Sequence, residues 1–238
     1  MPDQVTLDVI DRPAGGALAA MRTLGRLRRA WAPGMRQMIR LGTGHLVART
    51  LPAPTPRRIA VLTVWEEDAS GWERLLGDLA HSGREHWHVR AAITRAAFTE
   101  PWLGWTPDTA GTPPLDDHEP ALTLISGDLR ARFIHAFLHD AGLAAGHAFR
   151  QPGYLGGLGI QSSPLNTTSC SAWRTYGDAR AYAYRPGMHA TAMRRDRAEQ
   201  HHRTEWFLRL RPLEERGTLD GVAPFAGLLE PEPEPLVA

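Results

Sequence analysis

The sequence predicts an α+β fold made of two tandem ferredoxin-like halves, each in the order β-α-β-β-α-β, that pack sheet to sheet as an α+β barrel. Three observations support this prediction. Strand-like and helix-like hydrophobic patterns follow one another in the same order twice along the 238 residues. Trp65 and Trp173 fall at matching places, each near the end of the third strand of its half. An open antiparallel sheet has one apolar face, which the sheet of the other half can cover.

The first half, residues 1–110, is predicted to contain four strands and two helices. Residues 5–10 alternate apolar and polar side chains, as a half-buried strand does. Residues 14–31 carry apolar side chains at helical spacing, and the Pro-Gly pair that follows ends this helix. Residues 68–79 begin with acidic and serine residues, which favour a helix N-terminus. The other three strands are expected at residues 38–46, 58–65 and 89–98.

The second half, residues 119–217, repeats this order after a Pro-rich loop at residues 108–120. Its four strands are expected at residues 121–125, 154–161, 169–176 and 205–212, and its two helices at residues 128–149 and 186–200. The strand at 154–161 is unusually rich in glycine. The tail, residues 218–238, is rich in Pro and Glu, and we expect it to be loose.

Composition excludes several classes of protein. The chain contains no lysine, since all 27 of its Lys and Arg residues are arginine, and this excludes a Schiff-base lysine and a phosphate-loop lysine. Cys170 is the single cysteine, which excludes an internal disulfide and a cysteine-clustered metal site. A net charge of +1 gives little reason to expect nucleic acid as a partner.

The sequence also bears on location. No apolar run approaches the roughly 20 residues that a membrane-spanning helix needs. The N-terminal residues are acidic and start directly with a strand pattern, so we expect no signal peptide and a cytoplasmic location.

Four segments together resemble the family of spheroidene monooxygenases, which are haem-containing carotenoid oxygenases. They are LGTG at residues 41–44, VLTVWEEDA at 61–69, GGLGI at 156–160, and PGMHATAMR with EWFLRLRPL within 186–213. The resemblance implies the α+β barrel that chlorite dismutases, aldoxime dehydratases and cofactor-free antibiotic-biosynthesis monooxygenases also use. It implies haem b as cofactor and His189 as the ligand of its iron. Residues 161–164, QSSP, depart from the apolar stretch expected after the glycine strand, which weighs against a carotenoid substrate.

His189 lies at the start of the helix predicted at residues 186–200, two residues after a glycine. A histidine held there between two strands can bind a haem iron, provided that its second ring nitrogen is anchored. The alternative is an ordinary packing or capping residue. Met193 and Asp196 lie on the same helix face, four and seven residues later. Met193 is expected to pack against a porphyrin edge or against the sheet. Asp196 is expected to be a solvated or capping charge. If its side chain turns inward, Asp196 is a candidate anchor for the ligand histidine.

Two further groups of residues are candidates for the site. Gln161, Ser162 and Ser163 end the glycine strand, where they would orient a bound oxygen or substrate as catalytic residues, or simply form a polar turn. Trp173 and Arg174 are adjacent on a strand, so they point to opposite faces. An inward Trp173 would form a wall of the pocket, whereas an inward Arg174 would pair with a haem propionate.

The remaining histidines and the cysteine are weaker candidates. A strand can bring His86 and His88 to one face, but the sequence shows no third metal ligand for them or for His201 and His202. Two more histidines, at positions 135 and 139, have helical spacing for zinc without a glutamate base. Cys170 is expected to be a small buried side chain rather than a haem thiolate.

The leading hypothesis from the sequence is a haem-dependent monooxygenase of secondary metabolism that oxidises a hydrophobic or amphipathic small molecule. No sequence pattern for a flavin or nicotinamide cofactor is present, so an external electron donor, a ferredoxin or a reductase, is expected. Two alternatives remain open: a haem enzyme that carries out a non-oxidative dehydration or rearrangement, as aldoxime dehydratases do, and a haem-free ligand-binding protein. Either a monomer or a homodimer is compatible with the duplicated half.

Overall fold

The fold was analysed in a computed structural model. It describes residues 3–13, 34–45, 53–66, 83–100, 105–109, 111–163 and 165–229, together with a few single positions between 18 and 27 and between 71 and 76. The helices predicted at residues 14–31 and 68–79 lie for the most part outside the described residues. The single positions described within them, Leu18, Leu27, Trp72 and Leu76 among them, are helical.

Eight antiparallel strands close into one barrel in the order β1-β3-β2-β6-β7-β5-β8-β4. The strands are β1 (Gln4–Asp11), β2 (Met35–His45), β3 (Ala53–Trp65), β4 (Glu85–Phe98), β5 (Ala121–Leu129), β6 (Tyr154–Ser163), β7 (Asn166–Trp173) and β8 (His202–Gly217). Within the barrel each half keeps the same order, β4-β1-β3-β2 and β8-β5-β7-β6. The predicted α+β barrel of two ferredoxin-like halves is therefore confirmed.

Two seams join the halves, and they differ in length. The β4–β8 seam runs from the pair Trp87 and Gly217 to the pair Phe98 and Trp206. Among the described residues the β2–β6 seam holds three residue pairs, from Gly42 with Gln161 to Gly44 with Gly159. The barrel is thus closed firmly on one side and by a short contact on the other.

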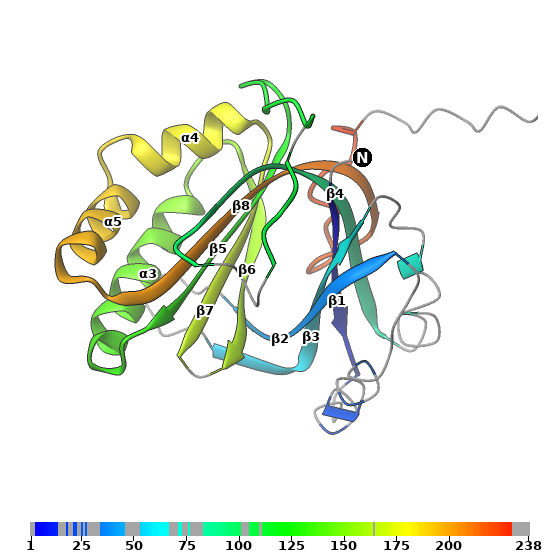
Figure 1. The fold of residues 1–238 in the computed structure, drawn as a ribbon, viewed down its shortest axis with the longest axis horizontal. Coiled ribbons are helices and arrows are strands. Elements are labelled where there is room, and N and C mark those ends of the chain that lie inside the picture. Colours follow the sequence, from blue (N-terminus) through cyan, green and yellow to red (C-terminus); the bar gives the residue numbers. More distant parts are fainter. Residues whose placement is uncertain are drawn as a thin grey trace, which may run out of the picture.

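All the helices that the structure describes in full lie on the outer side of the second half's strands (Figure 1). They are the short 3-10 helix η1 (Ala131–Phe133), followed by α3 (Ile134–Ala148), α4 (Tyr176–Tyr184) and α5 (Met188–Glu199). Among the described residues, none of the helices has both the length and the apolar character needed to cross a membrane.

The interior of the barrel is filled by alternate residues of the strands, because successive side chains of a strand point to opposite faces. On β7 and β5 these are Cys170, Ala172, Leu122 and Leu124, which belong to one continuous apolar cluster. The first part of the predicted loose tail joins this cluster through Leu219 and Phe225, which are buried. Residues 218–229 are therefore packed structure rather than a loose tail, and residues 230–238 lie outside the described part of the chain.

The structure corrects the predicted elements near residues 128 and 176. β5 continues to Leu129 because Asp128 accepts hydrogen bonds from Asn166 at 2.9 Å and from Thr204 at 3.0 Å, so the following α-helix begins only at Ile134. α4 was not predicted, and the strand expected to reach residue 176 ends at Trp173. The hydroxyl of Thr175 caps α4 by accepting from the backbone N–H of Asp178 at 3.1 Å. The helix predicted at residues 186–200 is confirmed as α5.

Candidate functional site

His189 is the second residue of α5, at the point where α3, α4 and α5 meet. Gly187 directly precedes the helix, and a Cβ atom there would lie 2.6 Å from Cε1 of His147 on α3. The glycine thus lets His147 pack against the start of α5. The ring of Tyr182, from α4, lies 4.6 Å from the His189 ring and 5.5 Å from the His147 ring, measured between centroids.

The imidazole of His189 has a buried Nδ1 atom with no hydrogen-bond partner among the described residues. The backbone of Ala183 lies near the ring and favours its protonated form. Burial lowers the pKa of His189 below its ordinary value, and the nearby His147 lowers it further. The ring is therefore neutral at neutral pH, which is the protonation state that a metal-ligating histidine needs.

A chain of aromatic rings extends from His189 to the sheet. Tyr182 lies 5.0 Å from Trp173, and Trp173 lies 5.3 Å from Tyr154, again between ring centroids. The hydroxyl of Tyr182 donates to the backbone carbonyl of Ala144 at 3.0 Å, which fixes α4 against α3. Trp173 is buried on the outer face of β7. These rings form a rigid apolar wall at one end of the layer between helices and sheet.

Next to this wall, the outer face of the sheet is lined mainly by small residues. Antiparallel pairing aligns two rows across β6, β7, β5 and β8. The rows are Gly157–Ser171–Thr123–Arg209 and Gly159–Ser169–Ile125–Phe207. Three strand spacings of about 4.8 Å make this surface about 14 Å wide.

The described helices do not cover this surface completely. Ile125 lies in the middle of β5, on the face that the helices overlie, and is nevertheless 40% exposed. The hydroxyls of Thr123 and Ser171 in the neighbouring row lie 2.9 Å apart and are hydrogen-bonded to each other. The surface therefore offers a flat, partly open floor with an apolar centre and hydroxyl groups beside it. We call the region between this floor, the aromatic wall and His189 the interlayer site.

Arg209 borders the floor and was not identified from the sequence. Its side chain is only 9% exposed, lies 4.1 Å above the ring of Tyr176, and has a buried Nε atom without a hydrogen bond. No carboxylate among the described residues forms an ion pair with it. A nearly buried guanidinium without a counter-ion favours an anionic group of a ligand. Alternation places residue 209 with Phe207 on one face, but only the closed barrel decides that this face meets the helices.

The predicted wall and helix residues fall in different places. Of the adjacent pair, Trp173 belongs to the interlayer site, whereas Arg174 is exposed. Met193 is half-buried on α5. Asp196 accepts from the backbone N–H of His201 and pairs with Nδ1 of His202 at 2.8 Å, so it joins the end of α5 to the start of β8.

Gln161, Ser162 and Ser163 are not brought beside His189. They end β6, whereas the aromatic wall stands at its beginning, where Tyr154 packs against Trp173. Tyr154 and Gln161 are seven residues apart, or roughly 23 Å along an extended strand. Ser163 is exposed, and its hydroxyl accepts from the backbone N–H of Asn166 at 3.2 Å, as expected of a polar turn. The side chains of Gln161 and Ser162 lie outside the described residues.

Most of the weaker candidates lie apart from the interlayer site. His135 and His139, which have helical spacing for zinc but were not expected to bind it, are exposed on α3. His201 pairs with Glu199 at 2.9 Å, and the carboxylates around His202 raise the pKa of that residue to about 9. Cys170 is fully buried inside the barrel, where burial raises the pKa of its thiol to about 12. It is thus a protonated, apolar side chain and not a thiolate ligand.

Comparison with known proteins identifies the fold. No protein-family model and no curated protein matches this chain. Among solved structures, an aldoxime dehydratase is similar with a TM-score of 0.55 and 12% identity over 89% of this chain and 82% of that one. An aldoxime dehydratase in complex with butyraldoxime gives a TM-score of 0.56 and 12% identity over 95% and 85%. A putative monooxygenase from Lactobacillus acidophilus covers 93% of this chain and 98% of its own at 8% identity, with a TM-score of 0.40. At these identities the likeness extends to the fold alone.

Proposed function

We propose that this protein is a haem-dependent monooxygenase that oxidises a hydrophobic or amphipathic small molecule, with His189 as the residue that would bind the haem iron. One observation carries the proposal. His189 has a neutral imidazole whose Nδ1 atom is buried without a hydrogen-bond partner among the described residues. A satisfied core histidine would use both nitrogens, whereas a ligand histidine keeps one lone pair for its metal.

Other residues of the interlayer site support the proposal. Glycine, serine and threonine residues flank the partly exposed Ile125 on the floor. Arg209 borders this floor with no carboxylate partner among the described residues, which suits it to a propionate group. Tyr182 packs against the imidazole of His189 and would hold the orientation of that ring.

Haem b, when bound, supplies the activation of dioxygen, for which the electrons come from an external ferredoxin or reductase. The chain itself would hold the substrate, orient it and exclude water from it. The wall of Trp173 and Tyr154 excludes water at one end of the site. Ile125 and Phe207 offer apolar contacts to a substrate, and the hydroxyl pair of Thr123 and Ser171 offers hydrogen bonds to its polar end. An amphipathic small molecule of secondary metabolism matches this combination better than a long polyene.

The visible absorption spectrum of purified protein, produced with haem supplied, tests the proposal. The wild type should show a Soret band, and His189→Ala should lose it or shift it. His135→Ala is the matched control, because His135 is exposed on α3 and the variant should keep the wild-type spectrum. A colourless wild-type protein, or an unchanged iron spectrum in His189→Ala, would refute the assignment and favour a haem-free ligand-binding protein.

A second haem function is a candidate because two similar solved structures with TM-scores of 0.55 and 0.56 are aldoxime dehydratases, one of them in complex with butyraldoxime. In that case the site would promote dehydration of a nitrogen-containing substrate without net oxidation. Turnover under strictly anaerobic conditions separates the two. Product formation without oxygen consumption indicates the dehydratase, and product formation that requires both oxygen and an electron donor indicates the monooxygenase.

A further inference from the structure

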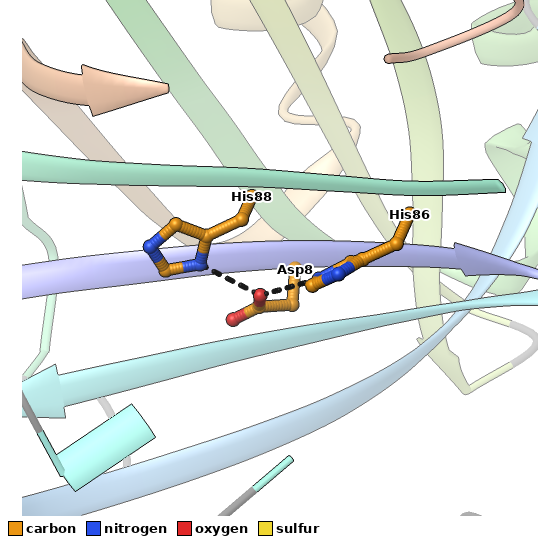
Figure 2. A group of neighbouring side chains, drawn as sticks. All are labelled: Asp8, His86 and His88. Carbon is orange, nitrogen blue, oxygen red and sulfur yellow. Dashed lines mark hydrogen bonds and ion pairs between the residues drawn. The ribbon is translucent and has the colours of Figure 1, made fainter. Parts of the chain in front are cut away.

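Two histidines and one aspartate meet on the outer face of the first half's strands, far along the chain from His189. Figure 2 shows Asp8 of β1 lying between His86 and His88 of β4. The antiparallel register pairs Asp8 with His88, and His86 lies on the same face two residues away. Oδ1 of Asp8 is 2.9 Å from Nε2 of His86 and 2.7 Å from Nδ1 of His88. This register supplies the third ligand that the sequence did not reveal for these two histidines.

The group is shielded from solvent on one side and open at its edge. The side chains of Asp8 and His88 are 1% and 0% exposed, whereas that of His86 is 19% exposed. The ring of Trp72 stacks on His88 at 3.8 Å between centroids. His88 is thus held in place by packing, and His86 gives access from solvent.

Asp8 has no arginine partner among the described residues, and the guanidinium of the nearby Arg90 pairs with Glu214 at 3.0 Å. Its carboxylate faces two imidazoles instead. A buried carboxylate needs compensation by its neighbours or by a bound cation.

The hydrogen bonding of the group is incomplete. Oδ2 of Asp8 and Nε2 of His88 are both buried without a partner among the described residues. A cluster that serves packing alone is expected to satisfy its buried polar atoms. Two imidazole nitrogens and one carboxylate form a ligand set that suits divalent first-row transition metals.

We propose that Asp8, His86 and His88 bind one divalent transition-metal ion, for which zinc is the probe. The three ligand atoms lie within 4.8 Å of one another. A tetrahedral ion with bonds of about 2.1 Å separates its ligand atoms by about 3.4 Å. The present separations of 2.7 and 2.9 Å therefore open by roughly half an ångström when the ion replaces the hydrogen-bonding protons.

Three protein ligands leave a fourth position, which faces the partly exposed edge at His86 and accepts water or a polar group of a ligand. The metal would also place a positive charge beside the buried Asp8. The site lies on the strands of the first half, so it is independent of the haem proposed at His189.

Zinc binding to the full chain, first treated with a chelator, tests the proposal by titration calorimetry. The wild type should bind one zinc ion per chain, and His86→Ala should raise the dissociation constant at least about a hundredfold, since even the loss of a group behind a metal ligand costs about 10–100-fold. Asp8→Asn, which keeps the shape of the side chain, should have a similar effect. Near-ultraviolet circular dichroism establishes that each variant is folded, and if one is not, the other provides the test.

Two control variants separate this site from other histidines. His135→Ala should keep wild-type binding, and so should His202→Gln, which removes the other group of close metal-ligating atoms, Asp196, His202 and Glu205. His189→Ala should also bind zinc normally, so that failure of the haem proposal leaves this result unchanged. Equal zinc affinity in the wild type, His86→Ala and Asp8→Asn would overturn the proposal. So would loss of binding in His202→Gln, or a zinc X-ray absorption spectrum without imidazole ligands.

Discussion

Asp196 connects the helix that carries His189 to strand β8, and this connection should make the stability of the fold depend on pH. Nδ1 of His202 lies 2.8 Å from Oδ2 of Asp196 and 3.3 Å from Oε1 of Glu205. These carboxylates outweigh the effect of burial and raise the pKa of His202 from 6.5 to about 9. The protonated form is therefore stabilised in the folded protein relative to the unfolded chain.

The sign and the size of the effect follow from this pKa. A raised folded-state pKa contributes stability that is fully present below about pH 6.5 and is lost as the pH rises through about 9. At about 1.36 kcal/mol per pKa unit, the free energy of unfolding falls by at most about 3 kcal/mol between pH 6.0 and pH 9.5. The side chain of Glu205 is 52% exposed, so solvent screening reduces the expected loss to about 2 kcal/mol.

Urea unfolding followed by tryptophan fluorescence at pH 6.0 and pH 9.5 measures this loss. Asp196→Asn keeps an acceptor for the backbone N–H of His201 but removes the charge, so its free energy of unfolding should change by less than about 1 kcal/mol over the same range. Asp140→Asn is the matched control, since Asp140 pairs with Arg195 of α5 rather than with a histidine, and it should keep the wild-type pH dependence. The chain has no lysine, so no lysine titration overlaps the alkaline end of the range. Identical pH dependence in the wild type and Asp196→Asn would refute the reasoning.

Three further predictions concern the interlayer site. Trp173→Ala should lower the free energy of unfolding by about 3–5 kcal/mol because it removes a buried ring, whereas the exposed Arg174→Ala should change it by less than about 0.5 kcal/mol, both measured by urea unfolding. Gly187→Ala should lower the free energy of unfolding by about 1–3 kcal/mol and reduce haem retention, because the added Cβ lies 2.6 Å from Cε1 of His147. Adding His147→Ala should restore both the stability and the haem retention. A double variant that is no better than Gly187→Ala would contradict this steric cause. Ile125→Trp should fill the uncovered floor and abolish the Soret band. The midpoint of urea unfolding should stay close to that of the wild type, because the side chain of Ile125 is 40% exposed. A full Soret band in this variant would place the haem elsewhere.

Local patterns were sufficient for most of the elements and for the candidate ligand. The alternation in β1 and the glycine-rich pattern of β6 identify strands without tertiary information, since a period of two and the residue types are local properties. The Pro-Gly pair before Met188 marks the start of α5, and with it the position of His189. α4 was missed although Thr175 and Asp178 form a capping signal, because the preceding strand pattern appeared to continue.

What the sequence by itself determined is thus the order of the strands, the duplicated halves and a histidine at the start of a helix. Only the tertiary structure decided which strand faces meet the helices and which distant residues become neighbours. Alternation divides a strand into two faces without saying which of them is inside, so the position of Arg209 on the floor appears only once the barrel closes. Asp8 meets His86 and His88 because antiparallel pairing aligns β1 with a strand that lies almost eighty residues further along the chain. That register depends on packing across the whole sheet, which no local pattern encodes.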